Sequence, residues 1–360
     1  MQRQISLDIF RGLTLSAMLL VNNPGSWSYV YSPLLHAKWH GLTPTDLIFP
    51  FFMFIVGASL FHSMKKVVTG HVPWIKIIKR TCFLFVIGLL LNIFPFVTDV
   101  NDWRVMGVLQ RIGICYGISA ILICILNKKQ LITINVLILI GYWLVLLLVN
   151  NPFTLEGNLV GQVDNLIFGS RHLYQGFGIA FDPEGVLSCL PSITTIFAGY
   201  FTSIMLSEQP NDKERIKKLL LWSVVTLIIT ALWQQWFPVN KALWTSTYVL
   251  VTSACAWLLL ASIIYFHDVK EFTSAFDWAK IFGSNPLFIY VLASLSSSTL
   301  LFISWRNEVD ELMNIHQLIY INLTNIMSPI NASLVFALLF VIVFYWLSAC
   351  LYKLRIFIKL

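Results

Sequence analysis

The sequence predicts an all-α polytopic membrane protein, a bundle of about ten transmembrane helices. Of its 360 residues, 58% are hydrophobic and only 11% are charged, and the mean hydropathy is +0.77. Near-uncharged apolar runs recur along the chain, each close to the roughly 20 residues that a helix needs to cross a bilayer. A soluble domain has neither property. The expected spans are residues 7–26, 44–64, 76–97, 104–126, 131–150, 185–206, 218–237, 243–266, 281–303 and 332–352.

The basic residues are distributed unequally between the two sides of the predicted membrane. With the N-terminus in the cytoplasm, 18 of the 24 Lys and Arg residues fall on that side. This is the positive-inside pattern, and it predicts that both termini are cytoplasmic. The net charge of +7 therefore reflects topology, and we expect no nucleic-acid partner. The six basic residues on or near the other side are Lys38, Arg104, Arg111, Arg171, Lys241 and Arg306.

The first span is expected to remain in the protein, because Asp8 and Arg11 lie within its first turns and no cleavage site follows. At a spacing of three residues, the two side chains either pair locally or leave Arg11 to face a cytoplasmic phosphate group. All six cysteines fall inside expected spans without a CxxC pair, which favours buried packing residues over disulfides or a thiolate metal site. With no internal repeat or linker, residues 1–360 are predicted to form a single membrane domain.

Residues 34–57 contain an unusual group of polar side chains. His36 and His40 lie on a short loop punctuated by glycine and proline, and Asp46 begins a long apolar helix. A carboxylate near the membrane interior costs several kcal/mol unless it is paired or solvated, so it indicates a functional site. A histidine there suits proton transfer, although a lone interfacial histidine is often only a polar surface group. His36 has the better position, because it follows a helix break and precedes Asp46.

Further polar residues are predicted at the same outer mouth of the bundle. Gln110 and Arg111 lie about two turns inside the fourth span, and Arg111 needs an anion, for which Asp46 and the later loop acids are candidates. Asp182 and Glu184 precede the sixth span. They are either favourable residues at a helix N-terminus or part of an acidic substrate site.

The turn between the seventh and eighth spans carries Asn240, Lys241 and Trp244, which look like part of the same site. His36 and His40 alone do not supply the three or four convergent ligands of a zinc site, so we expect no metal. These residues indicate a polytopic membrane protein with a polar, histidine-containing site near its outer face. Such a site fits a transporter or a membrane-embedded transferase.

The sequence resembles a known family, the membrane acetyltransferases typified by heparan-α-glucosaminide N-acetyltransferase. The resemblance covers nearly the whole chain in the same order, which makes it more specific than any one motif. The matching stretches are residues 6–12, 21–22, 36–43, 46–50, 107–111, 172–175, 182–185 and 238–241.

The resemblance implies transfer of an acetyl group from cytosolic acetyl-CoA to the amine of a terminal glucosamine on the far side of the membrane. It makes His36 the active histidine and Asn22 its nearby asparagine. The animal enzyme has asparagine at the position of His40, which leaves a different acceptor open. The nucleotide of acetyl-CoA is expected at the basic cytoplasmic face, with its pantetheine arm directed through the bundle toward His36.

In this scheme His36 either acts as a general base on the acceptor amine or accepts the acetyl group itself. Asn22 would donate a hydrogen bond to the thioester oxygen, and Asp46 would orient the imidazole. The other expected partners are the lipid bilayer and an amino-sugar acceptor, and a homodimer is possible. The expected location is a bacterial inner membrane. The alternative function is an amino-sugar or other small-molecule transporter. The residues expected to bind acetyl-CoA are Arg11, Gln110 and Arg111, and those expected to bind the acceptor are His40, Asp182, Glu184, Asn240, Lys241 and Trp244.

Overall fold

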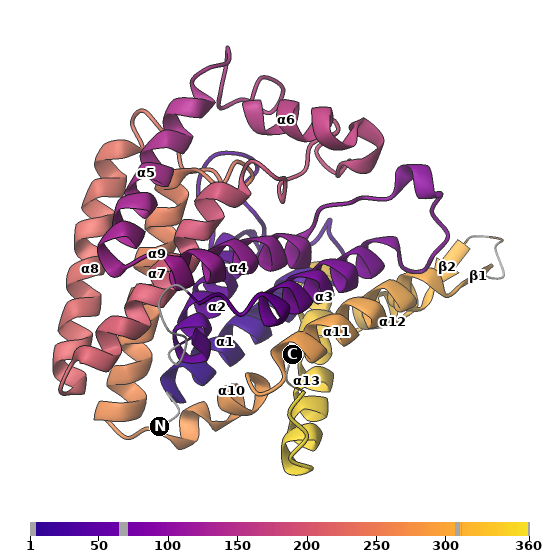
Figure 1. Cartoon of the computed structure of the whole chain (residues 1–360). Helices are drawn as coiled ribbons and strands as arrows, with labels where there is room; N and C mark the ends of the chain where they lie inside the picture. The colour runs from indigo at the N-terminus through magenta and orange to yellow at the C-terminus, as the bar shows by residue number, and fades with distance from the viewer. Residues whose placement is uncertain (1–4, 65–70, 307–309, 311, 359–360) are drawn as a thin grey trace.

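The computed structural model describes residues 5–64, 71–306, 310 and 312–358. Over these residues the chain is mainly helical, which confirms the predicted all-α polytopic class (Figure 1). Four basic residues counted on the cytoplasmic side, Arg3, Lys65, Lys66 and Lys359, lie outside the described residues. The long helices are α1 (Ile5–Asn22), α2 (Ile48–Met64), α3 (Trp74–Ile93), α4 (Val108–Ile125), α5 (Lys128–Leu146), α7 (Cys189–Glu208), α8 (Asp212–Trp233), α9 (Ser246–Ile263), α11 (Pro286–Phe302) and α13 (Pro329–Lys353).

Shorter elements connect these helices. They include α6 (Leu159–Phe168), α10 (Asp277–Phe282), α12 (Ile315–Thr324) and a small antiparallel hairpin of β1 (Ser304–Arg306) and β2 (Leu312–Asn314).

Each predicted span corresponds to one long helix. Within the described part of the chain, eight helices are long and apolar enough to cross a membrane by themselves. A ninth span arises if Ser274–Phe282 and Pro286–Phe302, which meet at a 68° bend, count together. The remaining expected span is α3, whose first two turns carry Lys76, Lys79 and Arg80 and are therefore less apolar.

The centre of the bundle is built on close backbone contacts between helices. A Cβ atom on Gly57 of α2 or on Gly199 of α7 would lie 1.8 Å from a backbone oxygen of the other helix. Only glycine permits this approach. The close contact expected at Gly113 and Gly117 also forms, since α4 packs there against α3, with a Cβ on Gly117 only 2.6 Å from Oγ1 of Thr81.

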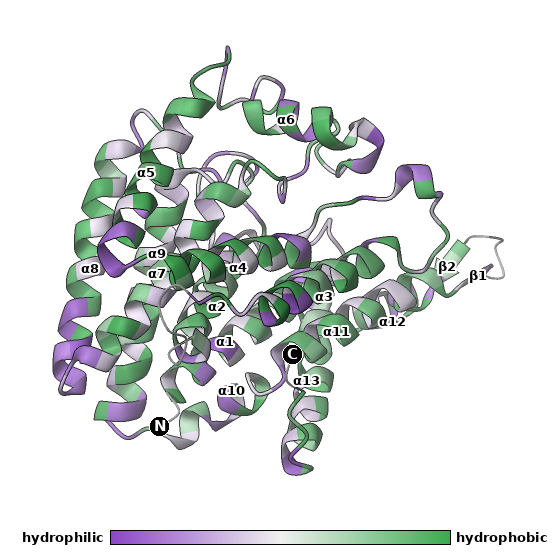
Figure 2. Ribbon diagram, in the orientation of Figure 1, coloured by the Kyte–Doolittle hydropathy of each residue, from purple (hydrophilic) through white to green (hydrophobic). Residues whose placement is uncertain are grey.

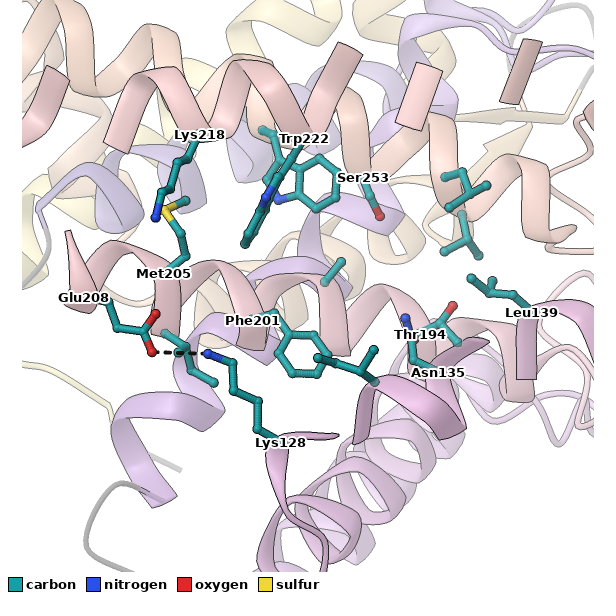
Figure 3. A pocket seen from close by; sticks show the side chains of 16 residues that line it. Lys128, Asn135, Leu139, Thr194, Phe201, Met205, Glu208, Lys218, Trp222 and Ser253 are labelled. Carbon is teal, nitrogen blue, oxygen red and sulfur yellow. Dashed lines mark hydrogen bonds and ion pairs between the residues drawn. The ribbon is translucent and has the colours of Figure 1, made fainter. Parts of the chain in front are cut away.

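The outermost helices are mainly hydrophobic (Figure 2), and they expose large apolar side chains such as Leu144 of α5, Ile228 of α8 and Val343 of α13. In α5 and in α8, only 22% of the most apolar 18-residue segment is buried inside the protein. A groove lies between these two helices (Figure 3).

The cysteines divide into buried and exposed residues in the same way as the helix faces. Cys115, Cys124 and Cys189 are buried, but Cys82 and Cys350 are exposed, so the expectation that all six are buried was wrong. These two lie on outward surfaces of α3 and α13, where the lipid chains are as apolar as a protein core.

The two ends of the bundle differ in composition. The loops before α2, before α7 and between α8 and α9 meet at one end, near α6 (Figure 1). At the other end α1 begins and α13 ends, both packed against α10 (Figure 1). The charged first turns of α8 also lie at this second end (Figure 2). The sidedness predicted from the basic residues stays a prediction.

Candidate active site

Asp46 is held by the local structure that begins α2. The segment Thr43-Pro44-Thr45-Asp46 forms a capping box, with Pro44 at the first position of a short 3-10 helix. Oδ2 of Asp46 accepts hydrogen bonds from the backbone N–H of Thr43 (3.0 Å), the Thr43 hydroxyl (2.9 Å) and the backbone N–H of Ala37 (3.1 Å). Asp46 is fully buried. These donors satisfy one carboxylate oxygen and leave the other for a functional partner.

That partner is His36. Its Nδ1 lies 2.7 Å from Oδ1 of Asp46, and its side chain is 48% exposed. Because a carboxylate only accepts hydrogen bonds, Nδ1 carries the hydrogen and the neutral ring keeps a lone pair on Nε2. The pair therefore presents a basic nitrogen at the outer mouth, supported from below by a buried anion.

Lys241 completes a cluster with these two residues. Its Nζ lies 3.0 Å from Nδ1 and 3.3 Å from Nε2 of His36, and 3.5 Å from Oδ1 of Asp46. Because Nδ1 donates to Asp46, only Nε2 can accept a hydrogen bond from this ammonium. Burial lowers the pKa of Lys241, and the negative charge of Asp46 opposes this shift. The ammonium thus balances the charge of Asp46, and it donates a hydrogen bond to Nε2 of His36.

Asn240 and Trp244 build the turn that carries Lys241. The side-chain oxygen of Asn240 accepts a hydrogen bond from the backbone N–H of Leu243 (2.8 Å), and its Nδ2 lies 3.3 Å from Nδ1 of His40. Both Asn240 and Trp244 are buried, whereas His40 is exposed. Burial of part of its ring lowers the pKa of His40. Asn240 and Trp244 therefore support the site from beneath, and His40 lies at its surface.

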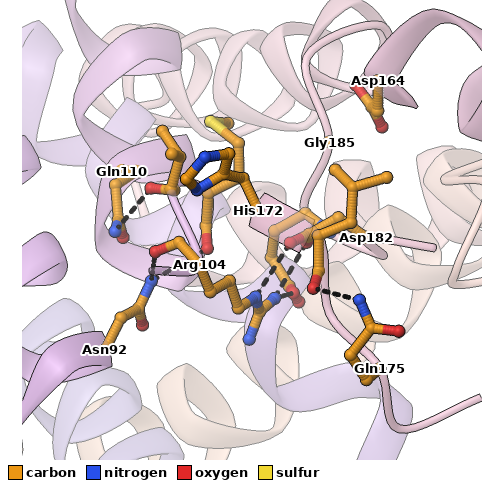
Figure 4. A network of polar contacts seen from close by, with 12 residues as sticks. Asn92, Arg104, Gln110, Asp164, His172, Gln175, Asp182 and Gly185 are labelled. Carbon is orange, nitrogen blue, oxygen red and sulfur yellow. Dashed lines mark hydrogen bonds and ion pairs between the residues drawn. The ribbon is translucent and has the colours of Figure 1, made fainter. Parts of the chain in front are cut away.

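Asp182 and Glu184 bind a cation that the sequence reasoning did not select. Arg104 donates to both oxygens of Asp182 at 2.8 Å and to Glu184 at 2.5 Å (Figure 4). The helix-cap interpretation of these acids was wrong, because α7 begins at Cys189 after Ser188. The two acids instead close the loop before α7 onto the loop before α4.

Arg104 was missed as a member of this cluster. Its signal in the sequence was charge balance, since Asp182 and Glu184 required a cation and few basic residues lie on the predicted outer side. The pKa of Arg104 is raised by its bonds to Asp182 and Glu184, against the lowering effect of its burial. Arg104, Asp182 and Glu184 thus form a largely buried structural ion cluster near the site.

Arg111 does not find the anion that the sequence predicted. In the described part of the chain no carboxylate lies within 4 Å of it, and Asp46 pairs with other groups. Its Nη2 donates to the backbone oxygen of Gly185 (3.2 Å) and to the Ser188 hydroxyl, and the guanidinium lies 4.9 Å from the ring centre of Trp244. Neither Nε nor Nη1 has a hydrogen-bond partner among the described residues. The arginine is accommodated by carbonyl, hydroxyl and ring contacts because it packs inside the bundle, below the loops.

Arg11 pairs locally with Asp8. Its Nη1 lies 2.7 Å from Oδ1 of Asp8, and its Nη2 lies 3.2 Å from the hydroxyl of Ser59. Arg11 also lines a cavity of about 220 Å³ between α1, α2, α3, α4 and α11. Arg80 and Tyr290 line the same cavity, and the rest of its wall is mainly apolar. Arg11 therefore pairs with Asp8 and lines this cavity at the same time.

A second cavity lies next to the first, between α1 and α11. It has a volume of about 210 Å³, and it shares Met18 and Tyr290 with the first. Asn22 and the hydroxyls of Ser297 and Ser298 line it. Asn22 is exposed, and no contact with His36 is recorded among the described residues. His36, the residue expected to act beside Asn22, does not line this second cavity.

Gln110 has a structural partner. Its Nε2 donates to the backbone oxygen of Val105 at 3.0 Å, and the side chain is buried. Its neighbours Leu109 and Ile112 line the first cavity, but Gln110 does not. Within the described ranges, no group of three His, Cys, Asp or Glu residues is arranged to hold a metal ion.

Comparison with known proteins adds a family to this geometry. A family model described as heparan-alpha-glucosaminide N-acetyltransferase, catalytic, matches residues 3–227. The human protein named heparan-alpha-glucosaminide N-acetyltransferase is 28% identical over 352 residues, which cover 79% of this chain and 52% of that protein. The mouse protein of the same name is 27% identical over 346 residues, with the same shares. The chain thus spans about half the length of the curated relatives it matches.

Proposed function

We propose that this chain, which belongs to the heparan-alpha-glucosaminide N-acetyltransferase catalytic family, transfers an acetyl group across a membrane. The donor is acetyl-CoA on the side of the basic loops, and the acceptor is the amine of a glucosamine-type sugar on the other side. The observation that carries the proposal is the pairing of the half-exposed His36 with the buried Asp46.

The chemistry requires a base close to the acceptor. An ammonium must lose a proton before its nitrogen attacks the thioester carbon, and Nε2 of His36 takes it once the acceptor replaces Lys241 at this nitrogen. The new C–N bond then forms as the C–S bond breaks, the attacking nitrogen gives up a second proton, and the released CoA thiolate takes up one of the two protons while the other leaves to solvent. Asp46 stabilises the imidazolium that forms. A two-step route, in which Nε2 first accepts the acetyl group, uses the same residues.

Two neighbouring cavities support the proposed path for the donor. The first contains Arg11 and Arg80 and suits an anionic group at its entrance. Beyond Met18 and Tyr290 the second cavity reaches Asn22, where an amide N–H can donate to the thioester oxygen as negative charge develops. We therefore assign acetyl-CoA binding to Arg11 and add Arg80.

The residues expected at the donor and acceptor sites divide by exposure. His40 and Lys241 retain accessible surface beside His36 and are proposed to contact the sugar. The remaining expected residues are buried and bonded within the protein, so we assign them support of the site. These are Asp182, Glu184, Asn240 and Trp244 for the acceptor, and Gln110 and Arg111 for the donor.

The test is an acetyl-transfer assay in proteoliposomes. Glucosamine is supplied on one side and acetyl-CoA on the other, and both CoA release and N-acetylglucosamine are measured. We expect His36→Ala to abolish transfer, while His71→Ala, which changes an exposed histidine outside the site, retains it.

Two results would contradict the proposal. One is a wild-type rate in folded His36→Ala protein. The other is uptake of intact amino sugar without CoA release, which is the behaviour of a transporter. An acceptor screen read out by CoA release then defines the sugar.

A further inference from the structure

A groove outside the acetyl-transfer site has its own chemistry. It lies between α5 and α8, its floor is formed by α7 and α9, and its volume is about 370 Å³. None of its lining residues belongs to the cluster of His36, Asp46 and Lys241. Ile132 at its edge is 46% exposed on a face of α5 that is directed toward the bilayer. The groove is therefore open to membrane components.

One end of the groove is positively charged. Figure 3 shows Lys128, Lys218 and Glu208 gathered at this end, with the rings of Trp222 and Phe201 further in. Lys128 and Glu208 form an ion pair at 3.2 Å. Lys218 has no ion-pair partner among the residues that the structure describes. One positive charge is thus left over, and it favours an anionic ligand.

The length of the groove matches one leaflet of a bilayer. Leu139 lies about 16 Å from Lys128 along α5, at roughly 1.5 Å per residue. Half of the hydrocarbon core is about 15 Å thick. On the predicted sidedness, the charged end lies with the basic loops at the level of the lipid head groups, and the far end lies near the middle of the membrane.

A buried hydroxyl in the groove lacks a partner. Ser253 is 3% exposed, and its Oγ makes no hydrogen bond within the described part of the chain. Asn135 also lines the groove, and its Oδ1 likewise has no hydrogen-bond partner among the described residues. Polar atoms in the hydrocarbon region need partners, because no water is available there. A ligand with its own polar groups below an anionic head would supply them.

We propose that the groove binds an anionic glycerophospholipid from the leaflet on the side of the basic loops. Its phosphate lies between Lys128 and Lys218, and an ester carbonyl accepts a hydrogen bond from Ser253. One acyl chain then follows the rings of Trp222 and Phe201 into the membrane. A free phosphate fits only the mouth of the groove, and it leaves the apolar wall and Ser253 without a partner.

The experiment measures lipid retention by native mass spectrometry. The full chain is purified from nanodiscs of phosphatidylcholine containing phosphatidylglycerol, and retained lipid is counted over a titration. We expect one phosphatidylglycerol per chain in preference to phosphatidylcholine, and a loss in affinity of about tenfold in Lys128→Ala/Lys218→Ala. The matched control, Lys129→Ala/Lys217→Ala, removes the same charge from adjacent exposed positions and retains the lipid.

Ser253→Ala is a second variant that keeps the packing volume nearly constant. We expect it to weaken phosphatidylglycerol binding several-fold, with an unchanged melting temperature. Equal retention by the groove variant and its control would overturn the proposal. Displacement of the lipid by coenzyme A or by inorganic phosphate at equal concentration would also overturn it, and would assign the groove to a soluble anion.

Discussion

Nδ1 of His36 lies 2.7 Å from Oδ1 of Asp46, and the second oxygen of that carboxylate is held by three hydrogen bonds from the loop itself. The imidazole is therefore oriented by a group that cannot move without breaking the start of α2. The remaining nitrogen, Nε2, lies 3.3 Å from Nζ of Lys241.

The Asp46→Asn substitution tests this orientation. The amide keeps the shape of the side chain but removes the charge that stabilises an imidazolium. We expect acetyl transfer to fall by roughly 100-fold or more, the range of a lost acid–base contribution. Asp102→Asn, an exposed acid of the outer loop, serves as the control and should retain activity. A small effect of Asp46→Asn on CoA release would rule out the role given to Asp46.

Removal of Arg104 should destabilise the fold. Arg104→Gln leaves the buried Asp182 and Glu184 without their cation, which typically costs about 3–5 kcal/mol. The free energy of unfolding in mixed micelles measures this loss. Arg171→Gln removes an exposed arginine from the segment before α7 and is expected to change stability by less than about 0.5 kcal/mol. Similar values for the two variants would show that the cluster is not structural.

The pH dependence of stability should reveal Asp164. Burial raises the pKa of Asp164 to about 6 in the folded protein, from an ordinary value of 3.8. The folded state therefore holds this proton more tightly. The resulting stabilisation is present below about pH 4 and is lost as the pH rises through about 6, a difference of roughly 3 kcal/mol.

Asp164→Asn does not titrate and should lack this part of the pH dependence. Melting temperatures between about pH 4.5 and 7.5 make the comparison, with Glu156→Gln as a variant that removes one carboxylate from the same outer segment. If wild type and Asp164→Asn lose stability in parallel over this range, the origin of the pH dependence lies elsewhere.

Arg80 should affect donor binding more than catalysis. It lines the first cavity beside Arg11, so we expect Arg80→Gln to raise KM for acetyl-CoA by roughly tenfold with little change in kcat. Lys79→Gln changes the neighbouring exposed residue of α3, which does not line the cavity. A reduced kcat with unchanged KM would instead connect Arg80 with the reaction itself.

The parts of the protein that could be predicted depend on short-range patterns. Apolar length identified the helices, because each span must satisfy its own backbone within the bilayer. Helical spacing brought Asp8 and Arg11 together, and the turn before α2 brings His36 to Asp46 across ten residues of chain. In such cases local geometry alone determines which atoms can meet.

Tertiary packing decided the long-range contacts. Lys241 reaches His36 across 205 residues of sequence, and Arg104 reaches Asp182 across 78. Arg111, expected to pair with Asp46, is instead enclosed by Trp244, Ser188 and a backbone carbonyl. Composition indicates only that a buried charge needs a partner. Which partner it meets depends on the depth and rotation of each packed helix, and many arrangements of the same spans satisfy the bilayer equally well.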